Sequence, residues 1–454
     1  MLTVTRLYYD RGTIVLEPKA PLSLPHFFKY DPRVGAFRAL ALHYRKAVEY
    51  LRKRGVKVED SVLQPLKGKI VTIAELKLRN YQKEALRKWI ENGMRGIIVL
   101  PTGAGKTRVA LACIEYLKKP TLIVVPTIEL MEQWEKRVKK YFKTKIGRFG
   151  GGDKSLGYIT IATYDSAYIN AEILGNKFEL IVFDEVHHLP SPGYRQIAEL
   201  NAAPYRLGLT ATPEREDGLH VDLSTLVGGI IYRRIVSDFK GRFLADFEIK
   251  TIRVKLSDEE RAEYRELMEK YKNYLKKHSI KIKSIRDFEK IIMRSGLDKE
   301  AREALLAWRE AKKIAFNASA KLEVLREILA KHRGDKVIIF TENNEFVRII
   351  SEEFLIPEIT YKTKPAERRA VLEGFRLGKF RAIVTSKVLE EGVDVPDANV
   401  AIVLSGTASR REFVQRLGRI LRPKKGKAIL YEVITSGTSE TRVSRKRKQV
   451  LEED

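Results

Sequence analysis

The sequence predicts an α/β protein that contains two domains built on parallel sheets. Short runs of apolar and β-branched residues without polar alternation recur along the chain, and longer stretches with helical spacing separate them. Strands of this kind are buried on both faces, as in a parallel sheet covered by helices. One set of runs lies within residues 96–210 and a second within residues 336–431, so we expect two such domains.

Length and charge narrow the class of protein. The chain has 454 residues, enough for about three domains of ~150 residues each. The 86 Lys and Arg residues outnumber the 59 Asp and Glu residues, which gives a formal net charge of +27. This excess favours a polyanionic partner such as nucleic acid, although a basic surface that only keeps the protein soluble gives the same composition.

The cysteine count and the longest uncharged stretch exclude several classes of protein. The single cysteine, Cys113, excludes a disulfide framework and a cysteine-rich metal site, and its apolar helical surroundings indicate a core position. The longest stretch without a charged residue, Ala398–Ser409, is shorter than the ~20 apolar residues that span a bilayer. The N-terminus lacks a signal-peptide core. We therefore expect an intracellular protein without membrane contact, cytoplasmic or nucleoid-associated, or nuclear in a eukaryote.

The first segment, residues 1–70, reads as a small N-terminal α+β domain. Residues 7–16 form two strand-like runs around an Asp-Arg-Gly turn, and residues 36–54 show helical spacing that ends at Gly55. The first α/β domain is expected at 71–245 and the second at 316–440, with a charged tail at 441–454.

The segment between the two α/β domains, residues 246–315, is expected to be a helical insertion with a linker. It is highly charged and carries scattered aromatic residues: Tyr264, Tyr271, Tyr274, Phe288 and Trp308. Two interpretations stay open for it. The helices could contact nucleic acid, or they are simply solvated, with their aromatic side chains packed inward.

A glycine-rich loop is the strongest local signal. Residues Leu100–Thr107, with the sequence Leu-Pro-Thr-Gly-Ala-Gly-Lys-Thr, follow an apolar strand and precede a helical run. Such a loop wraps backbone N–H groups around phosphate oxygens, and the helix N-terminus adds partial positive charge. Lys106 would reach the β- and γ-phosphates, and the Thr107 hydroxyl would ligate Mg²⁺. Leu100 departs from the strict pattern, which begins with Gly. The residues expected at ATP are Thr102, Gly103, Ala104, Gly105, Lys106 and Thr107.

An acidic strand end supplies the second half of an ATPase site. Glu179–Glu185 is an apolar strand that ends in two carboxylates. Asp184 would bind Mg²⁺ through water, and Glu185 would position and deprotonate the attacking water. Taken alone, such a strand end is commonly a turn. Together with the phosphate loop upstream, it predicts an ATPase with ATP and Mg²⁺ as cofactors.

These residues resemble a known family. Asp184–His187, Asp-Glu-Val-His, resembles the DExH box of superfamily 2 helicases, and Pro101–Thr107 has the form of motif I that is usual there. The resemblance implies tandem RecA-like domains. Further motifs follow in the family's order: Leu78–Gln82 upstream, Val125–Thr127 (motif Ia), Thr163–Ser166, Thr210–Thr212 (motif III), Ile339–Thr341 (motif IV), Thr385–Asp394 (motif V) and Gln415–Arg422 (motif VI).

The resemblance implies roles for individual residues at the nucleotide. Arg79 and Gln82 would contact adenine, and Gly392 and Asp394 would line the same cleft. Arg419 and Arg422 would act as arginine fingers that neutralise charge at the γ-phosphate.

Other roles implied by the resemblance concern the nucleic acid and the coupling between motifs. Phosphate-backbone contacts would come from Thr127, Thr163, Thr341 and Thr385, although each Thr alone is more simply a strand-end or helix-capping residue. His187 would couple the nucleotide site to motif VI. His188 is expected to be structural, since other ligands at metal spacing are missing.

One tripeptide narrows the family. Arg215, Glu216 and Asp217 resemble the RED motif of XPB-type superfamily 2 helicases, and the short chain resembles the archaeal XPB homologues. The alternative is a loop ion pair at the surface. Members of this family carry a small damage-recognition-like N-terminal domain and a thumb-like helical insertion, and both fit this sequence in position. The RED residues would then lie where the DNA strands separate.

The resemblance implies an ATP-dependent 3′–5′ DNA helicase or translocase that opens duplexes in nucleotide-excision repair or transcription initiation. Its partners would be single-stranded or forked DNA and a nuclease, docking on the thumb or the second α/β domain. Two alternatives stay open: an RNA helicase, and a DNA-binding or annealing scaffold with ATPase activity that supports a partner nuclease. The intact motif set from Lys106 to Arg422 argues against an inactive enzyme.

Overall fold

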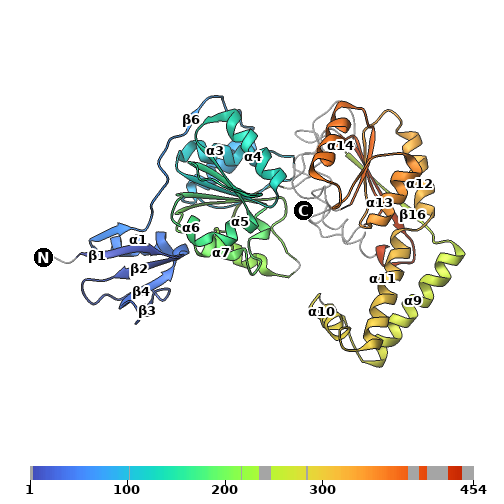
Figure 1. The fold of residues 1–454 in the computed structure, drawn as a ribbon, viewed down its shortest axis with the longest axis horizontal. Coiled ribbons are helices and arrows are strands. Elements are labelled where there is room, and N and C mark those ends of the chain that lie inside the picture. The colour runs from blue at the N-terminus through green and yellow to red at the C-terminus, as the bar shows by residue number, and fades with distance from the viewer. Residues whose placement is uncertain are drawn as a thin grey trace. The chain divides into compact units, whose positions relative to one another are not determined.

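The computed structural model describes residues 4–101, 103–215, 217–234, 247–282, 285–386, 398–405 and 428–441 (Figure 1). The chain divides into two compact units, Met1–Ile235 and Val236–Asp454. Among the helices of the described ranges, none combines the length and the apolar character that a membrane span requires.

The first unit begins with a small α+β domain. Its strands lie in the order β3-β4-β2-β1-β5, and helix α1 (Tyr44–Lys53) packs on this sheet. The strands are β1 (Thr5–Asp10), β2 (Thr13–Glu17), β3 (Lys29–Asp31), β4 (Ala36–Leu40) and β5 (Val58–Ser61). The expected turn is present, because Arg11 and Gly12 link β1 to β2 with positive φ angles of 44° and 85°. The helical spacing read across residues 36–54 was wrong for its first part, since Ala36–Leu40 pairs with β2 and β3.

The small domain is anchored to the α/β domain that follows it. The Tyr9 hydroxyl donates to the backbone oxygens of Glu172 (2.8 Å) and Leu200 (3.1 Å). Ala202 of the α/β domain packs within the apolar core of the small domain. Both parts therefore belong to one compact unit.

An eight-stranded sheet forms the centre of the first α/β domain. Its strand order is β11-β10-β12-β8-β13-β14-β7-β15, and all neighbours are parallel except β10 and β11. The strands are β7 (Arg95–Val99), β8 (Thr121–Val125), β10 (Ile146–Gly150), β11 (Asp153–Lys154), β12 (Ile159–Thr163), β13 (Leu180–Asp184), β14 (Tyr205–Thr210) and β15 (Ile230–Arg233). A separate pair joins β6 (Val71–Thr72) and β9 (Phe142–Lys143).

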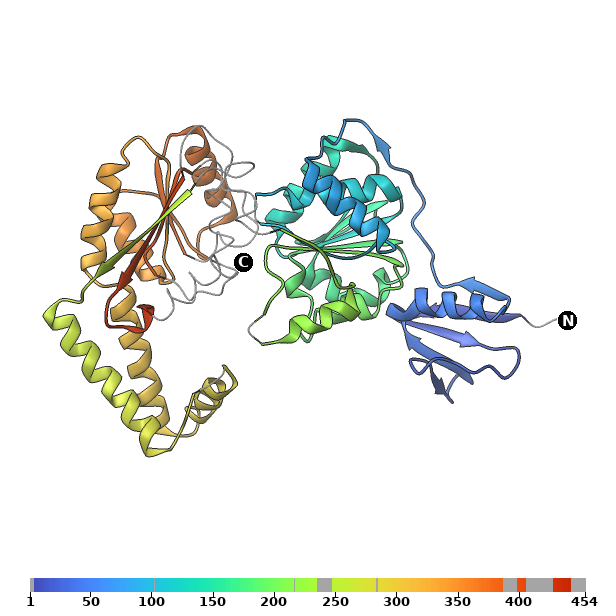
Figure 2. The same ribbon diagram turned by 180° about the vertical axis from the view of Figure 1, so that it is seen from behind.

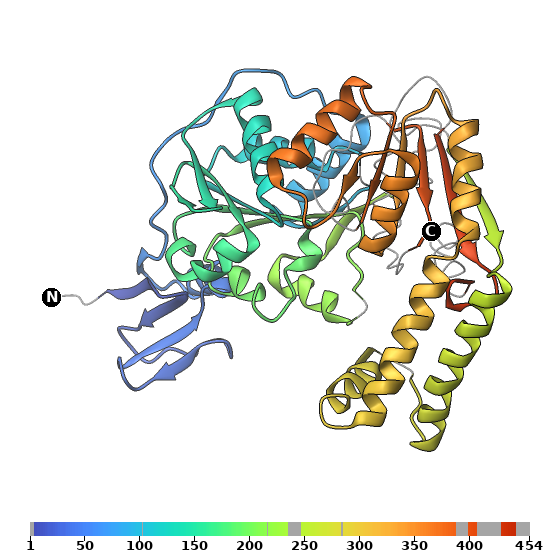
Figure 3. The ribbon, with the colours of Figure 1, turned by 45° about the vertical axis from the view of Figure 1, so that its right-hand side comes forward.

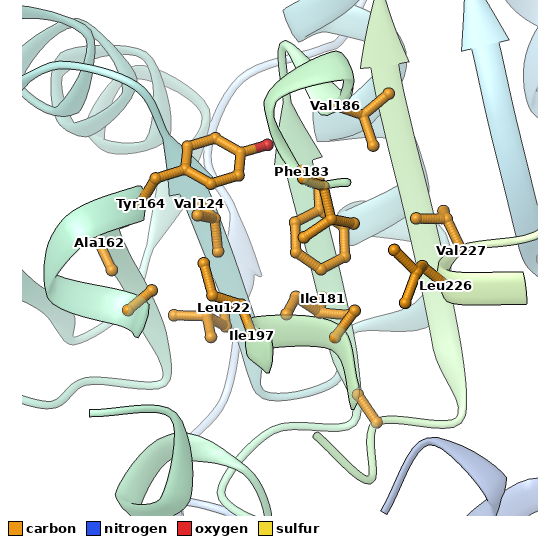
Figure 4. Close-up of a cluster of buried hydrophobic side chains, with 14 of the residues drawn as sticks. Leu122, Val124, Ala162, Tyr164, Ile181, Phe183, Val186, Ile197, Leu226 and Val227 are labelled. Carbon is orange, nitrogen blue, oxygen red and sulfur yellow. The ribbon is translucent and has the colours of Figure 1, made fainter. Parts of the chain in front are cut away.

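Helices cover both faces of this sheet (Figures 1 and 2). They are α2 (Asn80–Glu91), α3 (Lys106–Leu117), α4 (Ile128–Tyr141), α5 (Tyr164–Ile169), α6 (Ala171–Leu174), α7 (Arg195–Glu199) and α8 (Leu223–Leu226). Figure 4 shows one apolar layer, where Leu122 and Val124 of β8 lie beside Ile181 and Phe183 of β13. The unalternated apolar runs are therefore strands buried on both faces, as predicted.

The strand order explains where the motifs gather. Strands β12, β8, β13, β14 and β7 are consecutive neighbours in the sheet. A motif follows the carboxyl end of each one, and β14, which precedes motif III, lies between the phosphate-loop strand β7 and the DExH strand β13. Ligands of open α/β sheets bind at this edge.

The second unit contains a six-stranded, wholly parallel sheet with the order β16-β21-β20-β17-β19-β18. Its strands are β16 (Phe247–Val254), β17 (Val337–Phe340), β18 (Glu358–Ile359), β19 (Ala382–Thr385), β20 (Val400–Val403) and β21 (Ala428–Thr435). Helices α12 (Ala320–Lys331), α13 (Asn344–Phe354) and α14 (Pro365–Leu377) accompany it. The boundary expected at residue 246 is corrected here: β16, from the segment assigned to the helical insertion, pairs with β21 along its whole length.

Three helices project from this unit as the expected thumb-like insertion. They are α9 (Asp258–Lys277), α10 (Ile285–Arg294) and α11 (Lys299–Phe316), and α9 lies along α11 (Figures 2 and 3). Tyr271 and Tyr274 are buried against Ala301 and Ala304, and Trp308 packs on the same cluster. Of the two open interpretations, inward packing of the aromatic residues is the one that the structure shows.

Candidate nucleotide site and motor motifs

The phosphate loop has the backbone that the sequence predicts. Gly103 and Gly105 have φ angles of 84° and 86°, in the left-handed region that side chains disfavour. Gly105 is also the N-cap of α3, so the first N–H groups of that helix open toward the loop. A Cβ atom at Gly105 would lie 2.5 Å from Nε2 of Gln82. Both glycines are therefore favoured by conformation, and a Cβ atom at Gly105 would also have to displace the Gln82 amide.

Side chains of helix α2 support the backbone of this loop. The Tyr81 hydroxyl and Nε2 of Gln82 both donate to the backbone oxygen of Ala104, at 2.6 and 3.0 Å. Oε1 of Gln82 accepts from the backbone N–H of Arg79, the N-cap of α2, at 2.9 Å. Burial raises the pKa of Tyr81, so its hydroxyl stays a donor. The Gln82 amide, expected at adenine, thus supports the loop backbone. The adjacent Tyr81 was not assigned a role from the sequence.

The expected catalytic residues of the first domain lie together. Nζ of Lys106 is 3.8 Å from Oε1 of Glu185 and donates to the backbone oxygen of Leu100 at 3.3 Å. Asp184 ends β13 and is buried. The structure therefore brings the lysine of motif I and the two carboxylates of the DExH box into one site.

Glu185 carries backbone strain at this site. Its φ of 48° is unusual for a residue with a side chain and costs about 1–2 kcal/mol. The buried Tyr164 hydroxyl donates to the backbone oxygen of Asp184 at 3.0 Å and helps to hold this turn. Burial raises the pKa of Tyr164, so it keeps its proton. The Glu185 carboxylate of this strained turn lies beside Lys106.

Two side chains of α4 reach the residues expected to hold magnesium. Nε1 of Trp134 donates to Oδ2 of Asp184 at 2.8 Å, and Nη1 of Arg137 donates to Oγ1 of Thr107 at 2.6 Å. Neither residue was singled out from the sequence. The sequence feature that could have identified them is their spacing of three residues, which puts both side chains on one face of the helix that follows motif Ia.

The donor set fits Mg²⁺. Thr107 offers a hydroxyl oxygen and Asp184 carboxylate oxygens, the hard ligands that this ion prefers. Within the part of the chain that the structure describes, there is no group of three or more His, Cys, Asp and Glu residues that could hold a metal ion. Magnesium sites of this type take their remaining ligands from phosphate and water.

Motif III and the RED loop both contact the DExH box. Nδ1 of the buried His187 is 3.0 Å from the Thr210 hydroxyl. Nη1 of Arg215 donates to the His187 backbone oxygen at 2.6 Å, and its Nε donates to Oδ1 of Asp217 at 3.0 Å. The hydrogen bonds from Arg215 lower the pKa of Asp217 to about 2. The ion pair left open as an alternative is present, and the same arginine also joins the RED loop to the box.

The four threonines expected at the nucleic-acid backbone use their hydroxyls within the protein. Thr127 and Thr163 are the N-caps of α4 and α5 and accept from backbone N–H groups. The Thr341 hydroxyl pairs with that of Ser405 at 2.7 Å, and the buried Thr385 hydroxyl donates to a neighbouring backbone oxygen. The capping and strand-end roles are therefore the ones that the structure shows.

Several expected site residues lie outside the described residues. They are Thr102 of the phosphate loop, Glu216 of the RED motif, Gly392 and Asp394 of motif V, and Arg419 and Arg422 of motif VI.

A phosphate loop, a DExH strand and motif III at adjacent strand ends, with a second parallel α/β domain downstream, define a superfamily 2 helicase with tandem RecA-like domains. Comparison with family models agrees. Residues 7–62 match the Xeroderma pigmentosum group B helicase damage recognition domain, residues 75–215 the Type III restriction enzyme res subunit, and residues 304–454 the ERCC3/RAD25/XPB C-terminal helicase.

Relatives identify the family within this class. The chain is 47% identical over 443 residues to the DNA 3′-5′ translocase XPB2 of Sulfurisphaera tokodaii, covering 98% of this chain and 99% of that protein. It is 32% identical over 391 residues to the DNA 3′-5′ helicase XPB of Mycobacterium tuberculosis, covering 83% of this chain and 64% of that protein. The chain therefore belongs to the XPB family of helicases, which confirms the resemblance read from the motifs.

A solved structure supports the fold. The helicase domain of Hef from Pyrococcus furiosus aligns with a TM-score of 0.52 at 20% identity, covering 82% of this chain and 98% of that chain. At this identity the likeness shows the shared fold.

Proposed function

We propose that the chain is an ATP-dependent motor that moves 3′–5′ on DNA and opens duplexes in nucleotide-excision repair, transcription initiation or both, working at genomic DNA inside the cell. The observation that carries the proposal is the meeting of Lys106, Asp184 and Glu185 at one sheet edge. The DNA polarity is supported by the names of the archaeal and mycobacterial relatives. The cellular process is supported by an Arabidopsis thaliana relative, 30% identical, named as a helicase/translocase subunit of general transcription and DNA repair factor IIH.

The chemistry follows from this chain's own residues. The Lys106 ammonium balances negative charge on the terminal phosphates, and the N–H groups of the glycine loop donate hydrogen bonds to the phosphate oxygens. Glu185 takes the proton from the attacking water. Thr107 and Asp184 would hold Mg²⁺, which supplies positive charge at the phosphates when it is bound. Arg79 is proposed to face adenine, with Gln82 acting through the loop that it supports.

We assign Arg419 and Arg422 as arginine fingers because their motif VI sequence matches the family pattern. A guanidinium at the γ-phosphate neutralises charge that develops during phosphoryl transfer. Gly392 and Asp394 of motif V are proposed to belong to the same site. These assignments rest on the motif match.

DNA binding is proposed to follow the carboxyl-end motifs of both sheets. The helices capped by Thr127 and Thr163 begin at this edge, and their first N–H groups are phosphate-binding groups. In the second sheet Thr341 follows β17 and Thr385 ends β19, and both are proposed to act through their backbone as well. The net charge of +27 gives the general attraction.

The RED loop is proposed to work where the strands separate. Arg215 contacts His187 as well as Asp217, so it links the loop to the ATPase centre. We expect Arg215→Ala to lose unwinding more than ATP hydrolysis, with a smaller loss of hydrolysis through the His187 contact. Parallel unwinding and ATPase assays measure the two losses, and an equal reduction of both would contradict the assignment.

A fork-unwinding assay tests the proposed function. The expected result is unwinding of a DNA fork with a 3′ loading strand, and hydrolysis that single-stranded DNA stimulates more than single-stranded RNA. Unwinding only from a 5′ strand, or stronger stimulation by RNA, would contradict the proposal and favour the RNA-helicase alternative. Strong DNA annealing with little unwinding would favour the scaffold alternative.

A partner nuclease is proposed from the family resemblance alone, with docking on the thumb helices α9–α11 or on the second α/β domain. Pull-down with the full chain, followed by assay of the bound fraction for cleavage of forked DNA, tests it. Retention of a nuclease by the full chain supports the proposal, and the absence of cleavage activity in the bound fraction contradicts it.

A further inference from the structure

Helix α4 contacts both residues that would hold magnesium. Thr127 of motif Ia is its N-cap, and its buried face carries Met131, Trp134 and Val138. From this face Trp134 reaches Asp184 and Arg137 reaches Thr107. The first contact joins a neutral indole N–H to a carboxylate, and the second joins a cationic guanidinium to a hydroxyl.

The Trp134 contact is fixed. The indole is 1% exposed, so it cannot turn away without leaving a hole in the core. It donates to Oδ2 of Asp184, and Oδ1 of the same carboxylate accepts from the backbone N–H of Glu185 at 3.1 Å. The carboxylate plane is thereby set, and each oxygen keeps a further lone pair for a water or a metal ligand.

The Arg137 contact is displaceable. Its guanidinium is half-buried and donates to the Thr107 hydroxyl at 2.6 Å. Mg²⁺ coordinates oxygen at about 2.1 Å and would use the same hydroxyl. Two cations that close to one oxygen repel each other strongly. The ion and the guanidinium therefore compete for Thr107.

We propose that Arg137 is a positioning residue that competes with Mg²⁺ for Thr107, and that Trp134 is a second positioning residue that keeps Asp184 oriented for the ion. The inference rests on the nucleotide site of the proposed function. Arrival of the metal then moves a side chain of the helix that starts at motif Ia, which links the metal site to the segment proposed to face DNA.

Magnesium titration at a fixed, saturating concentration of a fluorescent non-hydrolysable ATP analogue tests the role of Arg137. Removal of the competing cation in Arg137→Ala should lower the half-saturating Mg²⁺ concentration by roughly threefold to tenfold, the effect of one charge-assisted hydrogen bond at a half-buried site. Arg137→Lys, which keeps the charge, should stay close to the unmodified protein. Lys136→Ala, an exposed neighbour on the same helix, is the matched control and should not shift.

The emission of Trp134 gives an independent readout. The chain has three tryptophans, so the signal is the difference between the unmodified protein and Trp134→Phe. Adding Mg²⁺ with the analogue should change the emission of the unmodified protein, because the hydrogen-bond partner of the indole approaches the ion. The change should be absent in Trp134→Phe. An emission of the unmodified protein that stays unchanged when Mg²⁺ and the analogue are added would overturn the role of Trp134, and this readout does not require Trp134→Phe to fold.

The possible outcomes separate this inference from the proposed function. Suppose that the unmodified protein binds the analogue in a Mg²⁺-dependent way. A half-saturating Mg²⁺ concentration of Arg137→Ala that equals that of Lys136→Ala, or exceeds that of the unmodified protein, then overturns the inference and leaves the ATPase site intact. Failure of the unmodified protein to bind the analogue at any Mg²⁺ concentration overturns both.

Discussion

At the scale of single residues, the site depends on a few residues that adopt constrained backbone conformations. Gly105 combines a left-handed backbone with contact to Gln82, and Glu185 accepts the same kind of backbone despite its side chain. Strain of this kind persists where the surrounding structure holds it, and it is common at active sites. Hydrogen bonds from Tyr81, Gln82 and Tyr164 to the backbone supply that support here.

Gly105→Ala is expected to weaken nucleotide binding by roughly tenfold, since a left-handed conformation costs a side-chain residue about 1–2 kcal/mol. The new Cβ atom also displaces Gln82 from the loop. Fluorescence titration with an ATP analogue measures the affinity. The control is Gly229→Ala, where a Cβ atom has no neighbour within 4 Å. Unchanged affinity in Gly105→Ala would show that the loop adapts to the side chain.

The pH dependence of the RED loop follows from Asp217. Its pKa is lowered to about 2 by Arg215, so the ion pair contributes fully above the ordinary carboxyl pKa of about 4 and is lost as the pH falls toward 2. The loss of unwinding in Asp217→Asn should therefore be the same at pH 6 and at pH 8. Unwinding assays of both proteins at the two pH values measure this ratio. A defect that grows with pH in this window would contradict the assignment.

Sequence reasoning predicted the chemistry of single residues better than their partners. Lys106, Asp184 and Glu185 were predicted from their motif and meet in one site. Gln82 was expected at the base, and the structure places its amide on the loop backbone. Trp134 and Arg137 were not found, because contact between α4, α3 and β13 depends on strand order, which no local pattern encodes.

At the scale of elements, buried strands were predicted well and edges less well. Runs such as 121–125 and 180–183 lack polar alternation and form central strands. Two strands that mix polar and apolar residues lie toward the edges of their sheets. Phe247–Val254 is an edge strand, and Ala36–Leu40 lies next to one. Such a pattern is compatible with helix and strand, and pairing with neighbours decides the outcome.

A buried arginine joins two short helices of the first α/β domain. Arg206 of β14 is fully buried and donates to the backbone oxygens of Ala198 (3.0 Å) and Leu226 (2.6 Å), at the ends of α7 and α8, and of Asn201 and Ala203. Burial lowers the pKa of Arg206 well below its ordinary value. These hydrogen bonds satisfy carbonyl oxygens at the helix ends, which would otherwise lack a donor in the apolar interior.

Arg206→Met is therefore expected to destabilise the protein by at least about 3 kcal/mol, since several buried carbonyls lose their donor. Thermal and urea unfolding of the full chain measure the loss in free energy of unfolding, read from the transition of the first unit, which contains Arg206. Arg87→Met on the exposed face of α2 is the control, with an expected change within about 0.5 kcal/mol. Equal stabilities of the two variants would contradict the bracing role of Arg206.

At the scale of the whole molecule, two parallel α/β domains, a small N-terminal domain and a thumb make an XPB-family helicase. The motifs of the first sheet meet at one edge because their strands are neighbours, and motifs IV and V begin at the ends of β17 and β19 in the second. The unalternated apolar runs predicted both sheets, and the order of the motifs predicted the family. The polar contacts that join motif III and the RED loop to the DExH box needed the structure.

We propose that Lys106, Asp184 and Glu185 form the site at which ATP hydrolysis drives DNA opening. The most direct measurement is DNA-stimulated ATP hydrolysis by Lys106→Ala beside DNA binding by the same variant. Hydrolysis and unwinding should vanish in Lys106→Ala while DNA affinity persists, and Lys118→Ala, at the exposed far end of α3, should keep both activities. Unchanged turnover in Lys106→Ala would show that ATP is hydrolysed at another site.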